Sequence, residues 1–374
     1  MTEIYLIRHT QAEGNIYRIM QGHWDGDVTP LGLKEIDALA ERFKGQELQA
    51  VYSSDLYRAY LTACALTKYN DLKVITDKRL RELDMGSWER QFFCNKLYET
   101  PDVVEQFLTS PWEWQVEGSE TLRMVADRAA EAVNELAEKH SGEKIAIVSH
   151  GVTIRCLLTR LLGLPEKGEG SAPIVKNTSV CMLNYENGKY RAGYLNDVSH
   201  LGNLPVSDWV QRDGIRHESF DPASDPGYYK KCYRDSWKFA HSGSLNGYSE
   251  ETYFKAAQKH FSACRDSVLR FYSGDQPAGL ADFDIERGKH AGYGWISLLY
   301  LEPEFRFQGY GIQALGRAIM LYNRLGRRAI RLNVAASNTA ALRFYEKCGF
   351  QMLAAEPGSD GPLYLMERSL GRIS

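Results

Sequence analysis

Two histidines each follow a short apolar run of the kind that forms a buried strand. His9 comes after the run Ile4–Ile7, with Arg8 between them. His150 comes after the run Ile145–Val148. In a parallel sheet the carboxyl ends of the strands lie on one edge, where open α/β folds bind their ligands. If these two strands are neighbours, the two imidazoles meet at that edge.

Besides Arg8, two further charged groups are expected at the same edge. Arg58 lies in the first turn of a predicted helix, and Glu82 lies in a turn-like segment. Guanidinium groups bind phosphate oxygens bidentately, a neutral imidazole can attack phosphorus, and a carboxyl group can protonate a leaving alkoxide. Because fixed cations stabilise the charge that spreads over the transition state, this set suits phosphoryl transfer without a metal.

Strands and helices alternate through the first half of the chain. Thr29-Pro30 has the form of an N-cap followed by proline at the first helical position, and Leu31–Phe43 has helical spacing. Long amphipathic spacing also predicts a helix over Thr121–Lys139. The other predicted strands are Ala50–Tyr52, Val74-Ile75, Val180–Leu183 and Tyr190–Tyr194. This alternation predicts an α/β fold with a mostly parallel sheet that is covered on both faces.

The second half of the chain has an α+β pattern of its own, after a predicted linker at Gly202-Asn203-Leu204-Pro205. A helical, tyrosine-rich stretch runs from Tyr228 to Cys264. Two β-like runs, Ala278–Ile285 and Gly294–Leu301, are joined by a short connection with a glycine, which is typical of a hairpin. The remaining predicted elements are strands Val268–Tyr272, Ile330–Val334 and Leu363–Met366 and helices Gln313–Leu325 and Thr339–Cys348. A chain of 374 residues has the length for two domains.

Composition excludes several classes of protein. The 45 Lys and Arg residues against 48 Asp and Glu residues give a formal charge of −3. The chain therefore has no net positive charge that would attract nucleic acid. The sequence shows neither an apolar run of membrane-spanning length nor the pattern of a signal peptide at its start. The seven cysteines never form CxxC, so we expect reduced thiols and no zinc site. These features predict a soluble, cytoplasmic protein without nucleic-acid or membrane partners.

The motifs of the first half, taken in order, resemble the histidine phosphatase (phosphoglycerate mutase-like) superfamily. They are Leu6-Ile7-Arg8-His9-Thr10 with Asn15, Ser53-Ser54-Asp55-Leu56-Tyr57-Arg58-Ala59, Leu80-Arg81-Glu82, Gly118-Ser119-Glu120-Thr121 and Val148-Ser149-His150-Gly151. The resemblance covers residues 1–202 and implies a three-layer α/β domain that acts on a small phosphorylated metabolite without a metal.

The same resemblance implies a role for each residue of the site. His9 would be the nucleophile that forms phosphohistidine, and Glu82 would be the proton donor. The groups that bind the phosphoryl oxygens would be Arg8, Asn15, Arg58 and His150. One departure from the family is Thr10, since that position usually holds glycine. Its side chain is expected to narrow the substrate pocket.

The choice between a phosphatase and a mutase depends on water. A mutase must keep phosphohistidine dry, whereas a phosphatase lets water attack it. The segment between Glu82 and Gly118 is short, which leaves limited material for the covering insertions that a dedicated mutase is expected to carry. The sequence therefore favours phosphomonoester hydrolysis, with a phosphoglycerate-type mutase as the alternative.

A glycine turn carries the chemistry that is predicted for the second half. The segment from Arg306 to Gly311, with Gly309 between them, follows a predicted strand and opens a helix. Glycines let the backbone approach a ligand closely, and successive N–H groups at a helix start can bind pyrophosphate. The turn resembles the R/Q-x-x-G-x-G/A signature of the GNAT (Gcn5-related) acyltransferases. The stretch from Asn333 to Phe350 is similar to that family's second cofactor motif.

This second resemblance implies a GNAT domain over residues 207–374, with a splayed central sheet, acetyl-CoA as cofactor and a small amine as acceptor. Asn338 would contact the cofactor arm, and Tyr345 would protonate the departing thiolate. The residues whose amides would hold the pyrophosphate are Phe307, Gln308, Gly309, Tyr310 and Gly311. Glu302 is a candidate base that could equally be a solvated loop acid. For the aromatic cluster of Tyr228, Tyr229, Tyr233 and Trp237, core packing is favoured over an acceptor pocket.

The favoured function is a bifunctional enzyme that combines phosphomonoester hydrolysis with acetyl transfer. Two alternatives keep the first domain active, as a phosphatase or a mutase. In one, the C-terminal half is a CoA-binding or regulatory module. In the other, it serves only to form a homo-oligomer. A further hypothesis is that both sites act on one small phosphorylated amine.

Overall fold

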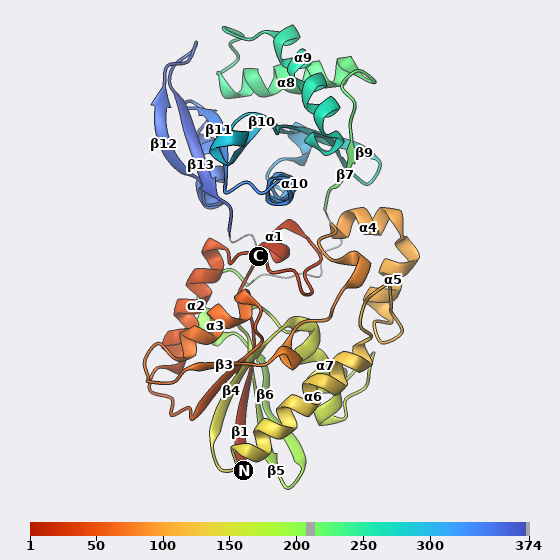
Figure 1. The fold of residues 1–374 in the computed structure, drawn as a ribbon, viewed down its shortest axis with the longest axis vertical. Helices are drawn as coiled ribbons and strands as arrows, with labels where there is room; N and C mark the ends of the chain where they lie inside the picture. Colours follow the sequence, from red (N-terminus) through yellow and green to blue (C-terminus); the bar gives the residue numbers. More distant parts are fainter. Residues whose placement is uncertain (207–213, 372–374) are drawn as a thin grey trace. The chain divides into compact units, whose positions relative to one another are not determined.

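The protein is described by a computed structural model, which covers residues 1–206 and 214–371 (Figure 1). The chain divides into two compact units, Met1–Gln211 and Arg212–Ser374. The predicted linker, which begins at Gly202, follows the short 3-10 helix η3 (Ser199–Leu201) inside the first unit. The expected start of the second domain, at position 207, lies outside the described residues.

The first unit is built on a sheet of six strands in the order β3-β2-β4-β1-β5-β6. The strands are β1 (Thr2–Arg8), β2 (Ala50–Ser53), β3 (Val74–Thr76), β4 (Lys144–Ser149), β5 (Val180–Glu186) and β6 (Lys189–Asp197). The pairs β3–β2, β2–β4 and β4–β1 are parallel, and the pairs β1–β5 and β5–β6 are antiparallel. The predicted, mostly parallel sheet is therefore confirmed.

Helices cover both faces of this sheet, which gives three layers (Figure 1). Ile4 and Leu6 of β1 pack in a cluster with α6 and α7, whereas Tyr5 and Ile7 pack in a cluster with α2 and α3. This alternation follows from the two-residue period of a strand. The helices are α1 (Glu13–Tyr17), α2 (Pro30–Phe43), α3 (Tyr57–Leu66), α4 (Phe93–Glu99), α5 (Pro101–Thr109), α6 (Leu122–Lys139) and α7 (Gly151–Leu162), with the 3-10 helices η1 (Lys78–Leu80) and η2 (Gly86–Trp88).

The segment between Glu82 and Gly118 contains helices α4 and α5, which the sequence analysis did not assign. These helices pack in an apolar cluster with the start of α6, which includes Phe93, Val104 and Leu122. The segment is therefore an ordered, packed part of the first unit.

The second unit is built on a sheet of seven strands in the order β12-β13-β11-β10-β9-β8-β7. The strands are β7 (Arg216–Ser219), β8 (Val268–Ser273), β9 (Gln276–Asp284), β10 (Tyr293–Leu301), β11 (Ala329–Ala335), β12 (Gln351–Glu356) and β13 (Leu363–Ser369). The predicted hairpin is formed by β9 and β10. Strands β10 and β11 run parallel and pair only from Tyr293 to Trp295, so they splay apart toward their carboxyl ends.

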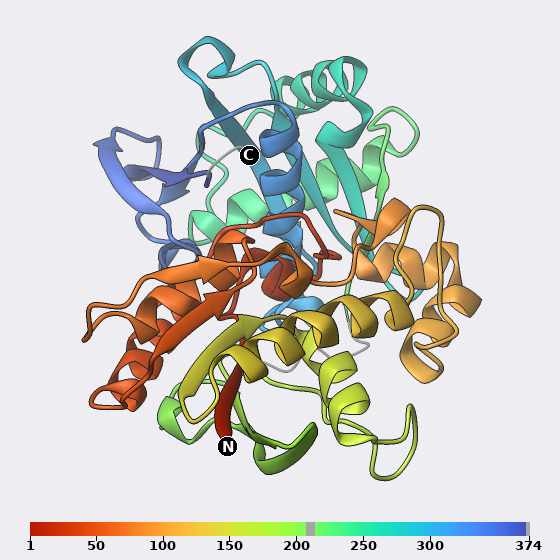
Figure 2. The ribbon, with the colours of Figure 1, turned by 60° about the horizontal axis from the view of Figure 1, so that its bottom comes forward.

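Within residues 214–371, the α-helices of the second unit are α8 (Pro226–Ala240), α9 (Glu250–Ala263), α10 (Tyr310–Arg324) and α11 (Thr339–Lys347), with the 3-10 helices η4 (Arg265–Ser267), η5 (Lys289–Ala291) and η6 (Pro303–Phe305). Tyr229 and Tyr233 of α8 are buried in the core cluster under α8 and α9, so core packing is the correct interpretation for these two tyrosines. Figure 2 shows α10, in blue, lying across the strands of this unit. Gly294 of β10 is required under α10, because a Cβ there would lie 2.3 Å from the ring of Tyr322. Among the described helices, none has the length and apolarity to span a membrane.

Candidate functional site

The two histidines of the first unit lie side by side at one edge of the sheet. The parallel strands β1 and β4 pair Arg8 with Ser149, so His9 and His150 are each the next residue beyond that pair. Their ring centroids are 5.1 Å apart, and the His9 N–H donates to the Ser149 carbonyl at 2.9 Å. His9 is 4% exposed and His150 is 0% exposed. The strand register therefore brings both imidazoles into one buried site.

His9 is held in one tautomer by the backbone of the residue that follows it. Its Nδ1 lies 2.6 Å from the carbonyl oxygen of Thr10. A carbonyl can only accept, so Nδ1 carries the proton and Nε2 keeps its lone pair. Burial, together with the charges of Arg58 and Arg8, lowers the pKa of His9 well below its ordinary value. His9 is therefore a neutral imidazole with a nucleophilic Nε2 at neutral pH.

His150 has two buried ring nitrogens, and neither finds a hydrogen-bond partner among the described residues. Burial and the charges of Arg58 and Arg8 lower the pKa of His150 well below its ordinary value. A buried polar group without a partner costs free energy, so such groups usually have a function. The ring is suited to donate a hydrogen bond to an oxygen of a bound ligand.

Arg8 is a buried cation whose Nε lacks a hydrogen-bond partner among the described residues. Its Nη1 donates to the Val175 carbonyl at 2.7 Å, and its Nε is buried without a partner in the described part of the chain. Gly151 leaves room for this guanidinium at the start of α7, because a Cβ there would lie 3.3 Å from Nε. Burial lowers the pKa of Arg8, which expresses the cost of keeping this charge away from water.

Arg58 is fully buried and is oriented by the loop that precedes α2. Its Nη1 donates to the Trp24 carbonyl at 2.9 Å, and its Nη2 donates to the Gly22 carbonyl at 2.8 Å. Asp25 lies 3.7 Å from Nη1. Burial lowers the pKa of Arg58 to about 10, and its Nε has no partner among the described residues. Both arginines thus keep an unused Nε donor, which suits an anionic ligand.

The carboxylate of Glu82 lies next to the start of α7, the helix that follows His150. Its carboxylate oxygens accept from the amides of Val152 at 3.1 Å and Thr153 at 3.0 Å. The Thr153 hydroxyl lies 2.8 Å from the Arg81 carbonyl oxygen and 3.0 Å from Glu82 Oε1. The first turn of α7 therefore fixes a carboxyl group next to the second histidine, and an acid–base group is available at the site.

Arg128 holds the segment that carries Glu82, and the sequence analysis missed it. The guanidinium of Arg128 donates to the carbonyl oxygens of Arg79, Arg81 and Glu82 at 2.8 Å, 2.8 Å and 2.9 Å. It also pairs with both oxygens of Glu120 at 2.7 Å. No spacing rule connects these residues, because the acceptors are backbone atoms far away in the sequence.

Asn15 and Gln21 lie on the segment after β1. The side-chain oxygen of Asn15 accepts from the Ala12 amide at 2.9 Å, so it caps α1. Both polar atoms of the Gln21 side chain are buried without a partner in the described regions. Gly14 makes this placement possible, since a Cβ there would lie 1.9 Å from Gln21 Oε1. Gln21 is a candidate ligand group that the sequence analysis did not identify.

The Thr10 side chain turns toward helix α2. Its hydroxyl lies 2.6 Å from the Gly32 carbonyl oxygen and 2.8 Å from Glu35 Oε2. These contacts do not support the expectation that Thr10 narrows the substrate pocket.

Comparison with known proteins identifies the first unit. The family model "Histidine phosphatase superfamily (branch 1)" matches residues 4–198, which is more than half of the chain. The chain belongs to the histidine phosphatase superfamily. The resemblance that its motifs indicated is therefore confirmed.

The relatives of this histidine phosphatase cover the same half of the chain. A protein named "Probable phosphoglycerate mutase GpmB" from Proteus mirabilis is 32% identical over 217 residues, which cover 57% of this chain and 100% of that protein. Its namesake from Salmonella choleraesuis is 30% identical over 217 residues, with the same coverage. The solved structure of Bacillus stearothermophilus YhfR is 31% identical and covers 54% of this chain and 100% of that one, with a TM-score of 0.52.

A second family model, "Acetyltransferase (GNAT) family", matches residues 229–350. The histidine phosphatase domain is thus followed by an acetyltransferase domain, and the predicted order of the two is confirmed. The splay between β10 and β11 is the sheet geometry that this assignment predicted.

The glycine turn of the acetyltransferase domain presents free amides. Gly309 is the N-cap of α10 with φ of 80°, and Phe307 has φ of 61° with its side chain 93% exposed. The amides of Phe305 and Arg306 donate to nearby carbonyls. No carbonyl partner occurs within the described residues for the amides of positions 307–311. The turn therefore fits the pyrophosphate group that the family's cofactor carries.

Asn338 is the N-cap of α11, and Tyr345 lies within this helix. The Asn338 side-chain oxygen accepts from the Ala341 amide at 3.1 Å, so it caps this helix. The Tyr345 ring packs edge-on against Phe344 and Phe350, with centroids 5.1 Å and 5.2 Å away. Burial raises the pKa of Tyr345, so its hydroxyl keeps its proton at neutral pH. Their roles toward a cofactor stay predictions.

Glu302, the candidate base, is buried at the end of β10 and is not a solvated loop acid. Its two oxygens accept from Lys231 Nζ at 2.6 Å and 2.7 Å, and one of them accepts from the Tyr300 hydroxyl at 2.9 Å. An acceptor amine would have to replace Lys231 in order to reach this carboxylate.

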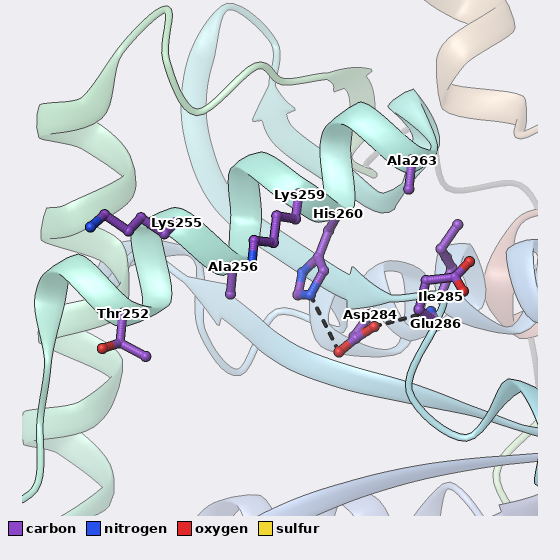
Figure 3. Close-up of a pocket in the computed structure, with 9 residues that line it drawn as sticks. All are labelled: Thr252, Lys255, Ala256, Lys259, His260, Ala263, Asp284, Ile285 and Glu286. Carbon is purple, nitrogen blue, oxygen red and sulfur yellow. Dashed lines mark hydrogen bonds and ion pairs between the residues drawn. The ribbon is translucent and has the colours of Figure 1, made fainter.

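A pocket of about 550 Å³ lies between α9 and the end of β9 (Figure 3). Its floor contains His260, whose Nδ1 lies 2.6 Å from Asp282 and whose Nε2 lies 3.3 Å from Asp284. Although burial opposes it, hydrogen bonds to these two carboxylates raise the pKa of His260 to about 9. His260 is therefore an imidazolium with both nitrogens engaged, and it cannot act as a base.

Proposed function

We propose that the first domain hydrolyses phosphomonoesters of small metabolites through a phosphohistidine on His9. The observation that carries this proposal is the state of His9, a neutral imidazole with its proton on Nδ1 and its Nε2 lone pair free. The unused Nε donors of Arg8 and Arg58 support the binding of a phosphoryl group beside it. Such fixed cations stabilise the charge of the transition state.

The reaction proceeds in two displacements. In the first, His9 Nε2 attacks phosphorus, the bond from phosphorus to the ester oxygen breaks, and Glu82 gives its proton to the leaving alkoxide. In the second, Glu82 takes a proton from a water molecule, which attacks the phosphohistidine and releases inorganic phosphate. The side chains that bind the phosphoryl oxygens are Arg8, Asn15, Gln21, Arg58 and His150.

A mutase is the second candidate, because the relatives that match over their whole length carry the name phosphoglycerate mutase. Both activities use the same phosphohistidine, and they differ in whether water or the first product accepts the phosphoryl group. The test is a panel of phosphomonoesters that includes 3-phosphoglycerate and phosphorylated amines, with inorganic phosphate and rearranged phosphoester measured in the same samples. We expect release of phosphate. Rearrangement without phosphate release would establish the mutase.

We further propose that the second domain transfers an acetyl group to a small amine. Acetyl-CoA supplies a thioester-activated acetyl group when it is bound. The amides of positions 307–311 bind the pyrophosphate, Asn338 contacts the cofactor arm, and Tyr345 gives a proton to the departing thiolate. The free amides of the glycine turn support this assignment. Release of CoA thiol that requires both acetyl-CoA and an amine tests it, whereas CoA binding without turnover would indicate a regulatory module.

A further inference from the structure

Glu35 of helix α2 is a fully buried carboxyl group that the proposed reaction does not use. Its Oε2 accepts from the Gln11 amide at 2.7 Å and lies 2.8 Å from the Thr10 hydroxyl. Its Oε1 is buried and has no partner among the described residues. Burying a carboxyl group is costly, so its position beside the residue that follows His9 calls for a function.

One peptide group connects this carboxyl group with the nucleophile. The Gln11 N–H and the Thr10 C=O belong to the same planar unit and point in opposite directions. On one side, the N–H donates to Glu35 at 2.7 Å. On the other side, the C=O lies 2.6 Å from Nδ1 of His9. The peptide is therefore held between a carboxyl group and the imidazole that must attack phosphorus.

The hydrogen bond to Glu35 sets the plane of this peptide, because the other bonds around Thr10 act on different groups. The Thr10 amide, which belongs to the preceding peptide, donates to the Thr62 hydroxyl at 2.9 Å. The Thr10 hydroxyl is engaged with Gly32 and Glu35. Neither bond acts directly on the carbonyl that faces His9. The bond from the Gln11 N–H to Glu35 does, because both ends of a peptide rotate together.

We propose that Glu35 is a positioning residue for His9, which acts through the Thr10–Gln11 peptide. By holding the N–H, Glu35 fixes the carbonyl that keeps the proton on Nδ1, so that Nε2 stays aligned with the phosphorus. A carboxyl acceptor also polarises the peptide and strengthens its carbonyl as an acceptor. This inference rests on the proposed phosphohistidine mechanism.

The competing explanation is that Glu35 only attaches α2 to the sheet. In that case, its loss lowers the fraction of folded protein but leaves the rate for each folded site unchanged. If Glu35 positions His9, its loss slows phosphohistidine formation at each folded site. The affinity for inorganic phosphate is then retained, because the arginines and His150 still bind this ground-state anion.

The decisive variant is Glu35→Met, which fills the space without accepting a hydrogen bond. Glu35→Gln is the rescue, because its amide oxygen can accept from Gln11. Asp37→Ala is the matched control, since it removes an exposed carboxylate from the same helix. Rapid-quench measurement of phosphohistidine from an aryl phosphate, normalised to folded protein, gives the rate. Product inhibition by inorganic phosphate gives the anion affinity.

We expect Glu35→Met to slow phosphohistidine formation roughly 10- to 100-fold, the order of loss that a small misalignment produces. Inhibition by inorganic phosphate should stay within about twofold of wild type, because the loss is one of alignment and not of anion binding. Glu35→Gln should recover most of the rate, and Asp37→Ala should match wild type. If Glu35→Met does not fold, Glu35→Asp replaces it, because its carboxylate is one methylene too short to reach the Gln11 amide.

Three results would overturn the inference. They are a wild-type rate in Glu35→Met or Glu35→Asp, an equal loss in Glu35→Gln, and a loss of inorganic phosphate affinity in proportion to the rate. A wild-type protein that forms no phosphohistidine would instead refute the proposed function. The two failures are therefore distinguishable in one set of experiments.

Discussion

Arg128 donates a hydrogen bond from Nη2 to the carbonyl oxygen of Glu82 at 2.9 Å, although 46 positions separate the two residues. The same guanidinium is paired with both oxygens of Glu120 at 2.7 Å. The backbone of the proposed proton donor is thus attached to α6, while its carboxylate is attached to the first turn of α7. The two helices, both distant from Glu82 in the sequence, together define the position of its carboxyl group.

Replacing Arg128 should therefore damage proton donation without removing a group that touches the substrate. Arg128→Lys keeps the charge but loses the planar fork that reaches three carbonyls and a carboxylate. We expect kcat for alkyl phosphates to fall by roughly 10-fold or more, with a smaller loss for aryl phosphates. Arg123→Lys, on an exposed position of the same helix, is the control. An equal loss for both classes of ester would contradict this role.

Glu82→Gln should show the same selectivity more strongly. Aryl phosphates have leaving groups that need little protonation, whereas alkyl phosphates depend on the acid. We expect a decrease of about 10²- to 10⁴-fold in kcat for alkyl phosphates and a much smaller one for aryl phosphates. Steady-state phosphate release from both classes measures this ratio. Parallel losses would mean that Glu82 is not the proton donor.

His9→Ala should abolish phosphate release, because it removes the Nε2 lone pair that the proposed mechanism uses to attack phosphorus. The affinity for CoA, measured by calorimetry, should not change, since the CoA site is assigned to the other domain. Turnover above the rate without enzyme would exclude His9 as the nucleophile.

Gly311→Val should weaken CoA binding. A Cβ at this position would already lie 3.3 Å from the Phe344 ring, so a branched side chain must displace either the ring or the first turn of α10. We expect at least a 10-fold rise in the dissociation constant for CoA, which corresponds to about 1.4 kcal/mol. Calorimetry with CoA measures it, and phosphate release serves as the control for folding. Unchanged affinity would place the cofactor elsewhere.

His260 should make the stability of the second unit depend on pH. Its pKa of about 9 in the folded state lies above the ordinary value near 6.5. The stabilisation is therefore fully present below about pH 6.5 and is lost as the pH rises through 9. It amounts to at most roughly 3 kcal/mol. The midpoint temperature of unfolding of the wild-type protein should be clearly lower at pH 10 than at pH 6. The difference between the two pH values should be smaller for His260→Gln. An identical pH response would refute the prediction.

The parts of the fold that burial and capping control could be predicted from the sequence. Thr29 and Pro30 begin α2 as expected, and the apolar runs before His9 and His150 form neighbouring strands. Strand β12 was missed because all six of its residues are exposed, so it shows no alternating pattern. Helices α4 and α5 were missed because they are short and lack strong caps.

Where the sequence placed a side chain at a strand end or a helix start, the structure has it there, because His9 and His150 follow β1 and β4 and Arg58 lies in the first turn of α3. The roles of these residues stay predictions. Arg128 and Glu35 were missed, because each acts on backbone atoms of another segment. Every residue has a main-chain acceptor, so the sequence does not indicate which of these acceptors a distant side chain contacts.

The tautomer of His9 is independent of the side chain that follows it. The contact that sets this tautomer comes from the main chain of Thr10 and not from its side chain. Any amino acid at that position brings the required oxygen with it. The protonation state of the proposed nucleophile therefore does not depend on the residue beside it, and threonine can stand where the family usually has glycine.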